Sequence, residues 1–205
     1  MKGMKDGLVV FVLVVALLLA MVTVGSAASQ LWYLDSADHP ATGNVMEKTM
    51  GAQSGNVTIS AGEEHIWLAD NSARFNVSFT GGLWIIELKT DPDWTDNCGV
   101  SVGGWDTTTG WYEISTTTNA TVIWKEHILK VELQKAPATI YEDDYLALKV
   151  RNEDGREHNV YTDGHSSLRS PDTDPGYPVP ELPTLVLTSA GLLALAGYQR
   201  IRRKN

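Results

Sequence analysis

Apolar and polar side chains alternate with a period of two along several short runs of this chain. In one run, Phe75, Val77 and Phe79 occupy the odd positions and polar residues occupy the even ones. The runs 128–134 and 145–152 alternate in the same way. Successive side chains of an extended strand point to opposite faces, so this alternation indicates strands with one face in a core and one in water.

Short runs rich in β-branched and aromatic residues, separated by Gly, Asn, Asp and Thr, predict strands along the middle of the chain. These runs are 31–34, 56–60, 65–68, 74–80, 83–89, 99–103, 111–116, 121–125, 128–134, 145–152 and 159–162. None of the segments between them sustains the spacing of an amphipathic helix. The sequence therefore predicts an all-β fold, a single antiparallel β-sandwich that is either jelly-roll-like or immunoglobulin-like. We expect an N-terminal signal helix and a C-terminal hydrophobic helix to flank it.

Two short turns are predicted inside this pattern. Gly81 and Gly82 separate two strand runs, as in a tight hairpin. Apolar residues then change from even positions, such as Trp124, to odd positions from Leu129 onward. A bulge or a short turn at 126–127 would account for this change.

The first 28 residues have the features of a secretory signal peptide. Lys2 and Lys5 precede a long apolar run, and small residues follow it. This order predicts signal cleavage at Ala27 and Ala28. The apolar run is also long enough for an uncleaved anchor, and in both cases residues 29–179 lie outside the membrane.

The last 26 residues carry a signal with three parts, which are a short motif, an apolar run and a basic end. The apolar run over 185–198 is shorter than the roughly 20 residues of a comfortable membrane span. The basic end would stay on the cytoplasmic side. An ordinary C-terminal anchor helix is the alternative interpretation. The motif itself is bracketed by prolines and consists of Pro180, Glu181, Leu182, Pro183 and Thr184.

This tail resembles the C-terminal sorting signals of the PEF-CTERM and PEP-CTERM type, which archaeosortases and exosortases read. The archaeal form has Pro-Glu-Phe followed by Pro-Thr, and this chain departs from it with Leu182 in place of Phe. The resemblance implies an archaeal exported protein that a membrane-embedded sorting transpeptidase cuts near the motif. It also implies a location outside the cell or on its surface, with at least a transient membrane tether. It covers the tail alone and implies nothing about the domain in front.

Charge distinguishes the two ends from the domain between them. Six of the 16 basic residues but only two of the 25 acidic ones lie in the ends, which leaves 10 basic and 23 acidic residues in 29–179. Nucleic acid requires a basic patch, so this acidic balance argues against a nucleic-acid partner. We expect the sandwich over 29–162, and then a polar, Pro-rich linker over 163–179 that holds it off the membrane.

Cys98 is the only cysteine of the chain. An exported domain with one thiol has no internal disulfide, so its core must suffice without one. Because Cys98 lies in a predicted strand, we expect it to be buried and inert.

Three asparagines and one acidic loop are candidate sites. The triplets that match the N-glycosylation pattern begin at Asn56, Asn76 and Asn119, and ordinary surface asparagines are the alternative. The loop places oxygen ligands of the kind that Ca²⁺ prefers within seven residues. Asp and Asn are also favoured in turns, which is the preferred interpretation, and no other cofactor is predicted. The loop residues are Asp91, Asp93, Asp96 and Asn97.

The chain contains seven tryptophans. Trp67, Trp84 and Trp124 lie in apolar strand runs and are predicted to belong to the core. Trp94, Trp105 and Trp111 lie in or beside polar loops. Exposed aromatic rings in such places stack on the rings of sugars, so these three are candidate glycan-stacking residues. The alternative is that they cap the core under the loops.

The expected function is that of an exported cell-surface structural or interaction protein. The alternative is a carbohydrate-binding module that acts on envelope or matrix polysaccharide. The sequence lacks histidine pairs at zinc-ligand spacing, a Gly-x-Ser-x-Gly motif and a phosphate-binding glycine loop. No catalytic residue is therefore named, and the chain is predicted not to be an enzyme. The third alternative is an enzyme with a cleft in which carboxylates converge, because the fold and not the sequence spacing sets such pairs. The expected partners are the membrane, a sorting transpeptidase and a surface polysaccharide.

Overall fold

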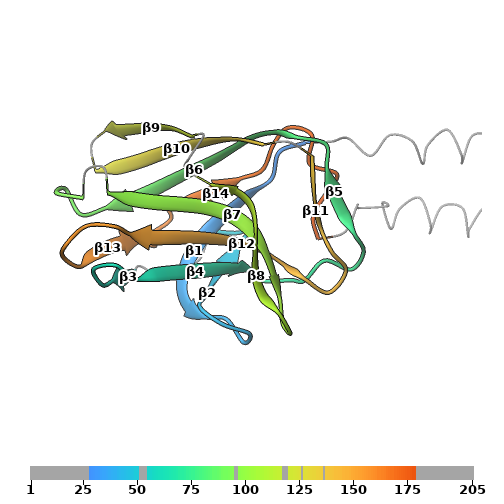
Figure 1. Cartoon of the computed structure of the whole chain (residues 1–205), viewed down its shortest axis with the longest axis horizontal. Helices are drawn as coiled ribbons and strands as arrows, with labels where there is room; N and C mark the ends of the chain where they lie inside the picture. The colour runs from blue at the N-terminus through green and yellow to red at the C-terminus, as the bar shows by residue number, and fades with distance from the viewer. Residues whose placement is uncertain are drawn as a thin grey trace, which may run out of the picture. The chain divides into compact units, whose positions relative to one another are not determined.

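The computed structural model describes residues 28–50, 55–94, 97–116, 120–125, 127–135 and 137–178. They belong to one compact unit, Ala27–Val179. Every regular element in these ranges is a strand (Figure 1). The same ranges contain no helix that is long and apolar enough to cross a membrane. The sorting motif, most of the predicted signal peptide, Asp96 and Asn119 lie outside the described residues.

The strands follow one another along the chain with short connections. They are β1 (Leu31–Asp38), β2 (Asn44–Glu47), β3 (Asn56–Ile59), β4 (Glu64–Ala69), β5 (Val77–Phe79), β6 (Gly82–Thr90), β7 (Cys98–Asp106), β8 (Gly110–Thr116), β9 (Ala120–Lys125), β10 (Ile128–Lys135), β11 (Ala138–Ile140), β12 (Tyr145–Asn152), β13 (His158–Tyr161) and β14 (Ser167–Arg169).

Twelve of these strands form one large mixed sheet. Ten of them lie in the order β3-β13-β6-β14-β1-β2-β4-β12-β7-β8, and β10 pairs with β6 and with β9. A small second sheet contains β5 and β11. The prediction of an all-β fold is confirmed, and the arrangement is consistent with a β-sandwich. The prediction of a purely antiparallel fold is wrong, because β2 pairs with β4 in parallel.

Strand β1 lies in the middle of the large sheet, between β14 and β2. Its first residues pair with β14, and the rest of the strand pairs with β2. The register on β2 shifts between Leu34 and Asp38, which marks an irregularity within this pairing. One buried cluster connects strands on both sides of β1. It contains Trp84 of β6, Trp67 of β4 and Leu148 of β12. Each such large apolar side chain contributes about 1.5–3 kcal/mol when it is buried.

The alternation of side chains is confirmed in β6, where every second residue from Trp84 to Thr90 is buried. In β12 it holds in part, because Leu146, Leu148 and Val150 are buried and Arg151 is exposed, but Ala147 on the other face is 0% exposed. In β5 the pattern holds for Val77 and Phe79 but fails for Phe75, which is 59% exposed. The reason is that the chain bends at residues 74–75 and becomes a strand only at Val77.

The two predicted turns have different outcomes. The hairpin at Gly81-Gly82 is wrong, because β5 pairs with β11 and β6 pairs with β10, β13 and β14. Both glycines have positive φ, at 107° and 139°, and they turn the chain from one sheet to the other. The short turn before Leu129 is confirmed, because β9 and β10 form a hairpin in which Lys125 pairs with Ile128.

Residues 163–178, here called the C-terminal segment, form part of the folded domain, so the prediction of a linker is wrong. Strand β14 of this segment lies between β1 and β6 in the large sheet. Further on, Tyr177 is 1% exposed. Its hydroxyl accepts a hydrogen bond from the backbone N–H of Leu146 at 2.8 Å and donates one to the carbonyl of Asn71 at 2.8 Å.

The polar residues that suggested a linker satisfy buried backbone groups instead. The hydroxyl of Ser170 accepts a hydrogen bond from the N–H of Gln30 at 2.8 Å. Ser166 donates to the carbonyl of Tyr161, and Asp174 accepts from the N–H groups of residues 176 and 177. Buried polar groups need such partners, so the same residue types suit a packed segment as well as a solvated one.

Candidate functional site

Three aromatic side chains form a row across β12, β7 and β8. Tyr145 of β12 pairs with Trp105 of β7, and Trp105 pairs with Trp111 of β8. Directly paired residues of antiparallel strands point to the same face of the sheet. All three side chains are partly exposed, whereas their strand neighbours Leu146 and Leu148 are buried. The row, here called the aromatic row, therefore lies on the outer face of the sheet.

The tip of the β7–β8 hairpin is fixed by its own hydrogen bonds. The carboxylate of Asp106 accepts from the N–H of Thr108 at 2.6 Å and from the hydroxyl of Thr109 at 3.0 Å. These bonds, that from Thr108 above all, hold the pKa of Asp106 below its ordinary value. Gly110 closes the turn with a φ of 86°. The two tryptophans are thus held opposite each other just behind the tip.

The ring of Trp111 lies against a glycine. A Cβ atom at Gly103 would overlap the carbonyl oxygen of Tyr112 and would lie 2.7 Å from Cη2 of Trp111. The missing side chain therefore makes the space that the indole occupies. Lys149 of β12 places its Nζ 4.5 Å from the centroid of the Trp111 ring and 3.4 Å from a carboxylate oxygen of Glu64. A cation over an indole face is attracted by the ring electrons.

The other end of the aromatic row packs against a histidine. The rings of His39 and Tyr145 meet edge to face, with centroids 4.7 Å apart. Burial lowers the pKa of His39, and the Ala69 carbonyl and the Asp70 carboxylate oppose this effect more weakly. The His39 ring is therefore held in its neutral form at neutral pH, and it supports Tyr145 by packing.

Trp94 does not belong to the aromatic row, so the prediction that it stacks on a glycan is wrong. Its side chain is 0% exposed and stacks on the ring of His158, with centroids 4.8 Å apart and an interplanar angle of 5°. Its Nε1 donates to the carbonyl of Asn97 at 3.3 Å. The loop after β6 folds over the core here, as the alternative interpretation expects. Trp67 and Trp84 are buried in the core as predicted.

Sequence reasoning found Trp105 and Trp111 but missed Tyr145 and Lys149. Both missed residues occupy odd positions of β12, opposite the apolar residues at even positions. That alternation was the available signal, because it places them on the outer face. The sequence does not show that β12 pairs with β7 in the register that sets Tyr145 beside Trp105.

The two described aspartates of the acidic loop bind protein groups. The carboxylate of Asp91 accepts from the N–H of Asn159 at 2.7 Å and from the hydroxyl of Tyr161 at 2.8 Å. Asp93 pairs instead with Arg156 at 2.7 Å. The structure therefore turns these two carboxylates to different partners. In the described ranges, no three His, Cys, Asp or Glu side chains are grouped as metal ligands would be.

Two of the three predicted glycosylation sites are described, and both are exposed. Asn56 lies on β3, and its amide donates to the side chain of Asn159 at 2.8 Å. Asn76 lies before β5, and its side-chain oxygen accepts from the N–H of Glu142 at 2.9 Å. Exposure suits modification, and glycosylation stays a prediction.

Cys98 is half-buried at the start of β7. Burial, with a smaller effect of the Glu153 carboxylate, raises the pKa of its thiol to about 12. The thiolate is the reactive form of cysteine, so a raised pKa favours the predicted inertness of this thiol, but its side chain is less buried than predicted.

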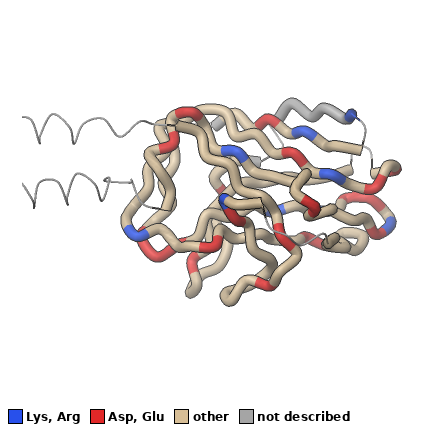
Figure 2. The backbone as a smooth tube through the Cα atoms, turned by 180° about the vertical axis from the view of Figure 1, so that it is seen from behind, with Lys and Arg blue, Asp and Glu red and all other residues tan. Residues whose placement is uncertain are grey.

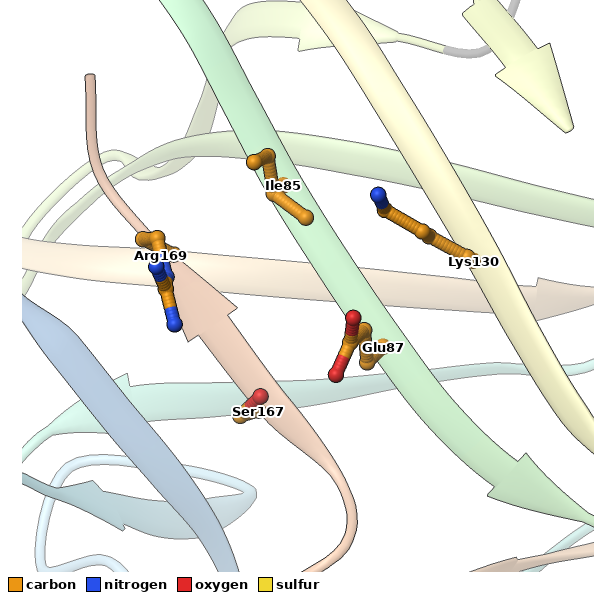
Figure 3. A pocket seen from close by; sticks show the side chains of 5 residues that line it. All are labelled: Ile85, Glu87, Lys130, Ser167 and Arg169. Carbon is orange, nitrogen blue, oxygen red and sulfur yellow. The ribbon is translucent and has the colours of Figure 1, made fainter. Parts of the chain in front are cut away.

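A small polar pocket opens on the outer face of β6, β10 and β14 (Figure 3). Its volume is about 140 Å³, below the roughly 300–1,000 Å³ of typical small-molecule sites. Lysine and arginine heads flank a glutamate in this pocket, and Lys130 is paired with Glu132 at 2.8 Å. The aromatic row is therefore the stronger candidate site. The pocket is lined by Ile85, Glu87, Lys130, Ser167 and Arg169.

Acidic positions are spread along the described backbone, with the fewer basic positions set among them (Figure 2). This distribution is that of an ordinary solvated surface.

Comparison with known proteins identifies relatives by structure alone. No protein-family model matches the chain, and no curated protein matches it. The chain is similar to a CocE/NonD family hydrolase from Staphylococcus aureus, with a TM-score of 0.53, 10% identity, and 70% of this chain and 36% of that chain covered. It is also similar to an alpha-amino acid ester hydrolase, with a TM-score of 0.51, 9% identity and the same two coverages.

The prediction that the chain is not an enzyme is contradicted by these comparisons, because both solved structures are hydrolases. The chain spans about a third of the length of these hydrolases, and at 9–10% identity the likeness shows the fold alone.

Proposed function

We propose that this chain is an exported cell-surface interaction protein, delivered by a signal peptide and processed by a sorting transpeptidase at its C-terminal motif. The observation that carries this proposal is the extent of the folded domain. The compact unit runs over Ala27–Val179, between the end of the predicted signal peptide and the start of the predicted motif at Pro180. In this proposal the domain is a jelly-roll-like or immunoglobulin-like sandwich, and a signal helix and a hydrophobic helix flank it.

The proposal is tested by changing the motif in the producing cells. In the double variant Pro180→Ala, Glu181→Ala the transpeptidase loses its recognition sequence, so the protein should keep its tail and run at a higher mass. The control is Glu157→Ala, which removes an exposed acid from the domain and leaves the motif intact. If the double variant is processed as fully as the control, the proposed role of the motif is wrong.

A second candidate function is binding of envelope or matrix polysaccharide, and the aromatic row favours it. Aromatic rings offer apolar area and a polarised face to sugar rings, and few side chains are needed to orient such a ligand. Tyr145, Trp105 and Trp111 supply three neighbouring rings on one face, with the ammonium group of Lys149 beside them.

Retention on polysaccharide from the producing organism tests this function. Trp111→Ala and Tyr145→Ala should each weaken binding about tenfold, which corresponds to about 1.4 kcal/mol. The matched control is Tyr33→Ala, a partly exposed tyrosine on β1 that pairs with β14 and β2 and lies outside the row. Undiminished retention of both row variants, or an equal loss in the control, would reject the row as the binding site. Release of hydrolysis products is measured in the same assay, because hydrolases share the fold.

A further inference from the structure

Two exposed aromatic side chains lie where the described chain ends. Phe75 is 59% exposed and Tyr141 is 57% exposed. They flank the small β5–β11 sheet at one end of the domain (Figure 1). The N–H of Arg74, directly before Phe75, donates to the carbonyl of Pro178 at 3.3 Å. Phe75 and Tyr141, here called the aromatic edge, therefore lie near Pro178, the last described residue.

The aromatic edge is held in place by backbone hydrogen bonds. The N–H of Ala73 donates to the carbonyl of Asp144 at 2.8 Å, and the N–H of Asp143 donates to the carbonyl of Ala73 at 2.7 Å. The N–H of Glu142 bonds to the side chain of Asn76 at 2.9 Å. The segments that carry Phe75 and Tyr141 are thus tied to each other, so both rings are presented at a fixed edge of the domain.

The sequence leaves little chain between this edge and the apolar tail. Six residues, 179–184, separate Pro178 from the apolar run that begins at Leu185. A chain advances at most about 3.3–3.6 Å per residue, so this connection spans roughly 25 Å at full extension. The C-terminal segment is packed in the domain, so it does not lengthen this connection. An apolar tail in a membrane would therefore hold this edge close to the lipid surface.

The chemistry of the aromatic edge suits the headgroup region of a bilayer. Tyrosine concentrates at membrane–water interfaces because its ring is apolar and its hydroxyl is polar, and Phe75 adds an apolar ring beside it. Arg74 is exposed beside Phe75, and Glu142 and Asp143 are exposed beside Tyr141. This mixture, with more acid than base, favours lipids of zero net charge over anionic lipids.

We propose that Phe75 and Tyr141 insert into the headgroup region of the membrane that holds the tail, and that they seat the domain on a lipid surface of zero net charge. The inference rests on the proposed function in one respect, which is that the tail enters the membrane, and it concerns the chain before the transpeptidase removes that tail.

The test uses the chain from Ala27 to Asn205, which keeps the whole compact unit and the tail. It is reconstituted into phosphatidylcholine vesicles and floated through a density gradient. Variants Phe75→Cys and Tyr141→Cys carry a nitroxide label, and Met50→Cys is the control. Met50 is also 59% exposed, but it lies away from the β5–β11 sheet in the chain. Its side chain is beside Gly164, a residue of the connection from β13 to β14. Every labelled variant also carries Cys98→Ser, so that the introduced cysteine is the only thiol of the chain.

The position of each label is read from two collision rates. Oxygen enters lipid and collides with a buried label, whereas a water-soluble nickel complex collides with a label in water. We expect the labels at 75 and 141 to gain oxygen collisions and lose nickel collisions on reconstitution, while the label at 50 stays in water. Protein that floats with the vesicles but keeps both edge labels in water overturns this inference and leaves the tail proposal standing. Protein that does not float overturns both.

Discussion

At the scale of single residues, the aromatic row depends on the absence of a side chain at Gly103. The indole of Trp111 occupies the space where a Cβ atom would lie. We expect Gly103→Ala to lower the free energy of unfolding by about 1–3 kcal/mol, because an added methyl group in a packed site forces its neighbours to move. Urea unfolding measures this change.

The matched control is Gly155→Ala, since a Cβ atom there meets nothing within 4 Å. Its free energy of unfolding should stay the same or rise by about 0.4–1 kcal/mol, because alanine restricts the unfolded chain. Equal stability of the two variants would mean that the Trp111 ring does not rest on Gly103.

A second residue-scale prediction concerns pH. Burial lowers the pKa of His65 from its ordinary value of 6.5, and its Nε2 lies 2.5 Å from the side-chain oxygen of Asn44. As the pH falls through about 6.5, the unfolded chain takes up a proton that the folded chain resists, so the free energy of unfolding decreases. His39, whose pKa is also lowered by burial, acts in the same direction.

The measurement is the urea midpoint of the wild type and of His65→Gln at about pH 7.5 and about pH 5.5. Glutamine does not titrate, so the variant should lose less stability than the wild type over this interval. The pKa values of Asp154 and Asp163 are lowered by hydrogen bonds to His158 and Lys89, so these carboxylates stay ionised throughout. An equal loss in both proteins would show that His65 is not the titrating group.

At the scale of elements, the C-terminal segment is what most changes the description of the domain. The hydroxyl of Tyr177 joins the N–H of Leu146 on β12 to the carbonyl of Asn71. Tyr177→Phe leaves the buried N–H without its partner and should cost about 1–3 kcal/mol. Thermal or urea unfolding checks this value.

Tyr141→Phe is the control for that prediction, because the Tyr141 ring is 57% exposed. A surface change of this kind should stay within about 0.5 kcal/mol. If Tyr177→Phe costs no more than Tyr141→Phe, residues 163–178 behave as a linker and their assignment to the domain is wrong.

The elements also show how far the sequence predicts this fold. The period-two pattern identified β10 and β12, because successive side chains of a strand point to opposite faces wherever the strand lies in the fold. The pattern does not identify pairing partners, so β5 was assigned to β6 although it lies on β11. Proline and serine occur in packed turns as well as in linkers, and only the buried environment of Ser166 and Tyr177 distinguishes the two.

The candidate site was predictable to the same extent. Trp105 and Trp111 were found from their residue type and their place beside polar loops. Trp94 had the same sequence signals but is covered by its stacking on His158, which lies 64 positions further along the chain. Tyr145 belongs to the row only because the register of β12 on β7 pairs it with Trp105. Contacts between distant strands decided each outcome, and the sequence gives no direct measure of them.

At the scale of the whole molecule, a β domain lies in the sequence between two segments that we propose to be signals for export and sorting. The folded part reaches Pro178, two positions before the motif that we propose a transpeptidase cuts. Such an enzyme would act close to the folded surface, because there is no spacer in between. In the proposals above, the aromatic row would bind a polysaccharide and the aromatic edge would face lipid.

The central claim is that the chain is exported and cut at both ends, and mass spectrometry of the protein recovered from the cell surface tests it most directly. We expect a mature chain that begins near Ser29 and ends within 180–184. Intact peptides that extend past Thr184 in the bulk of the surface protein would contradict it.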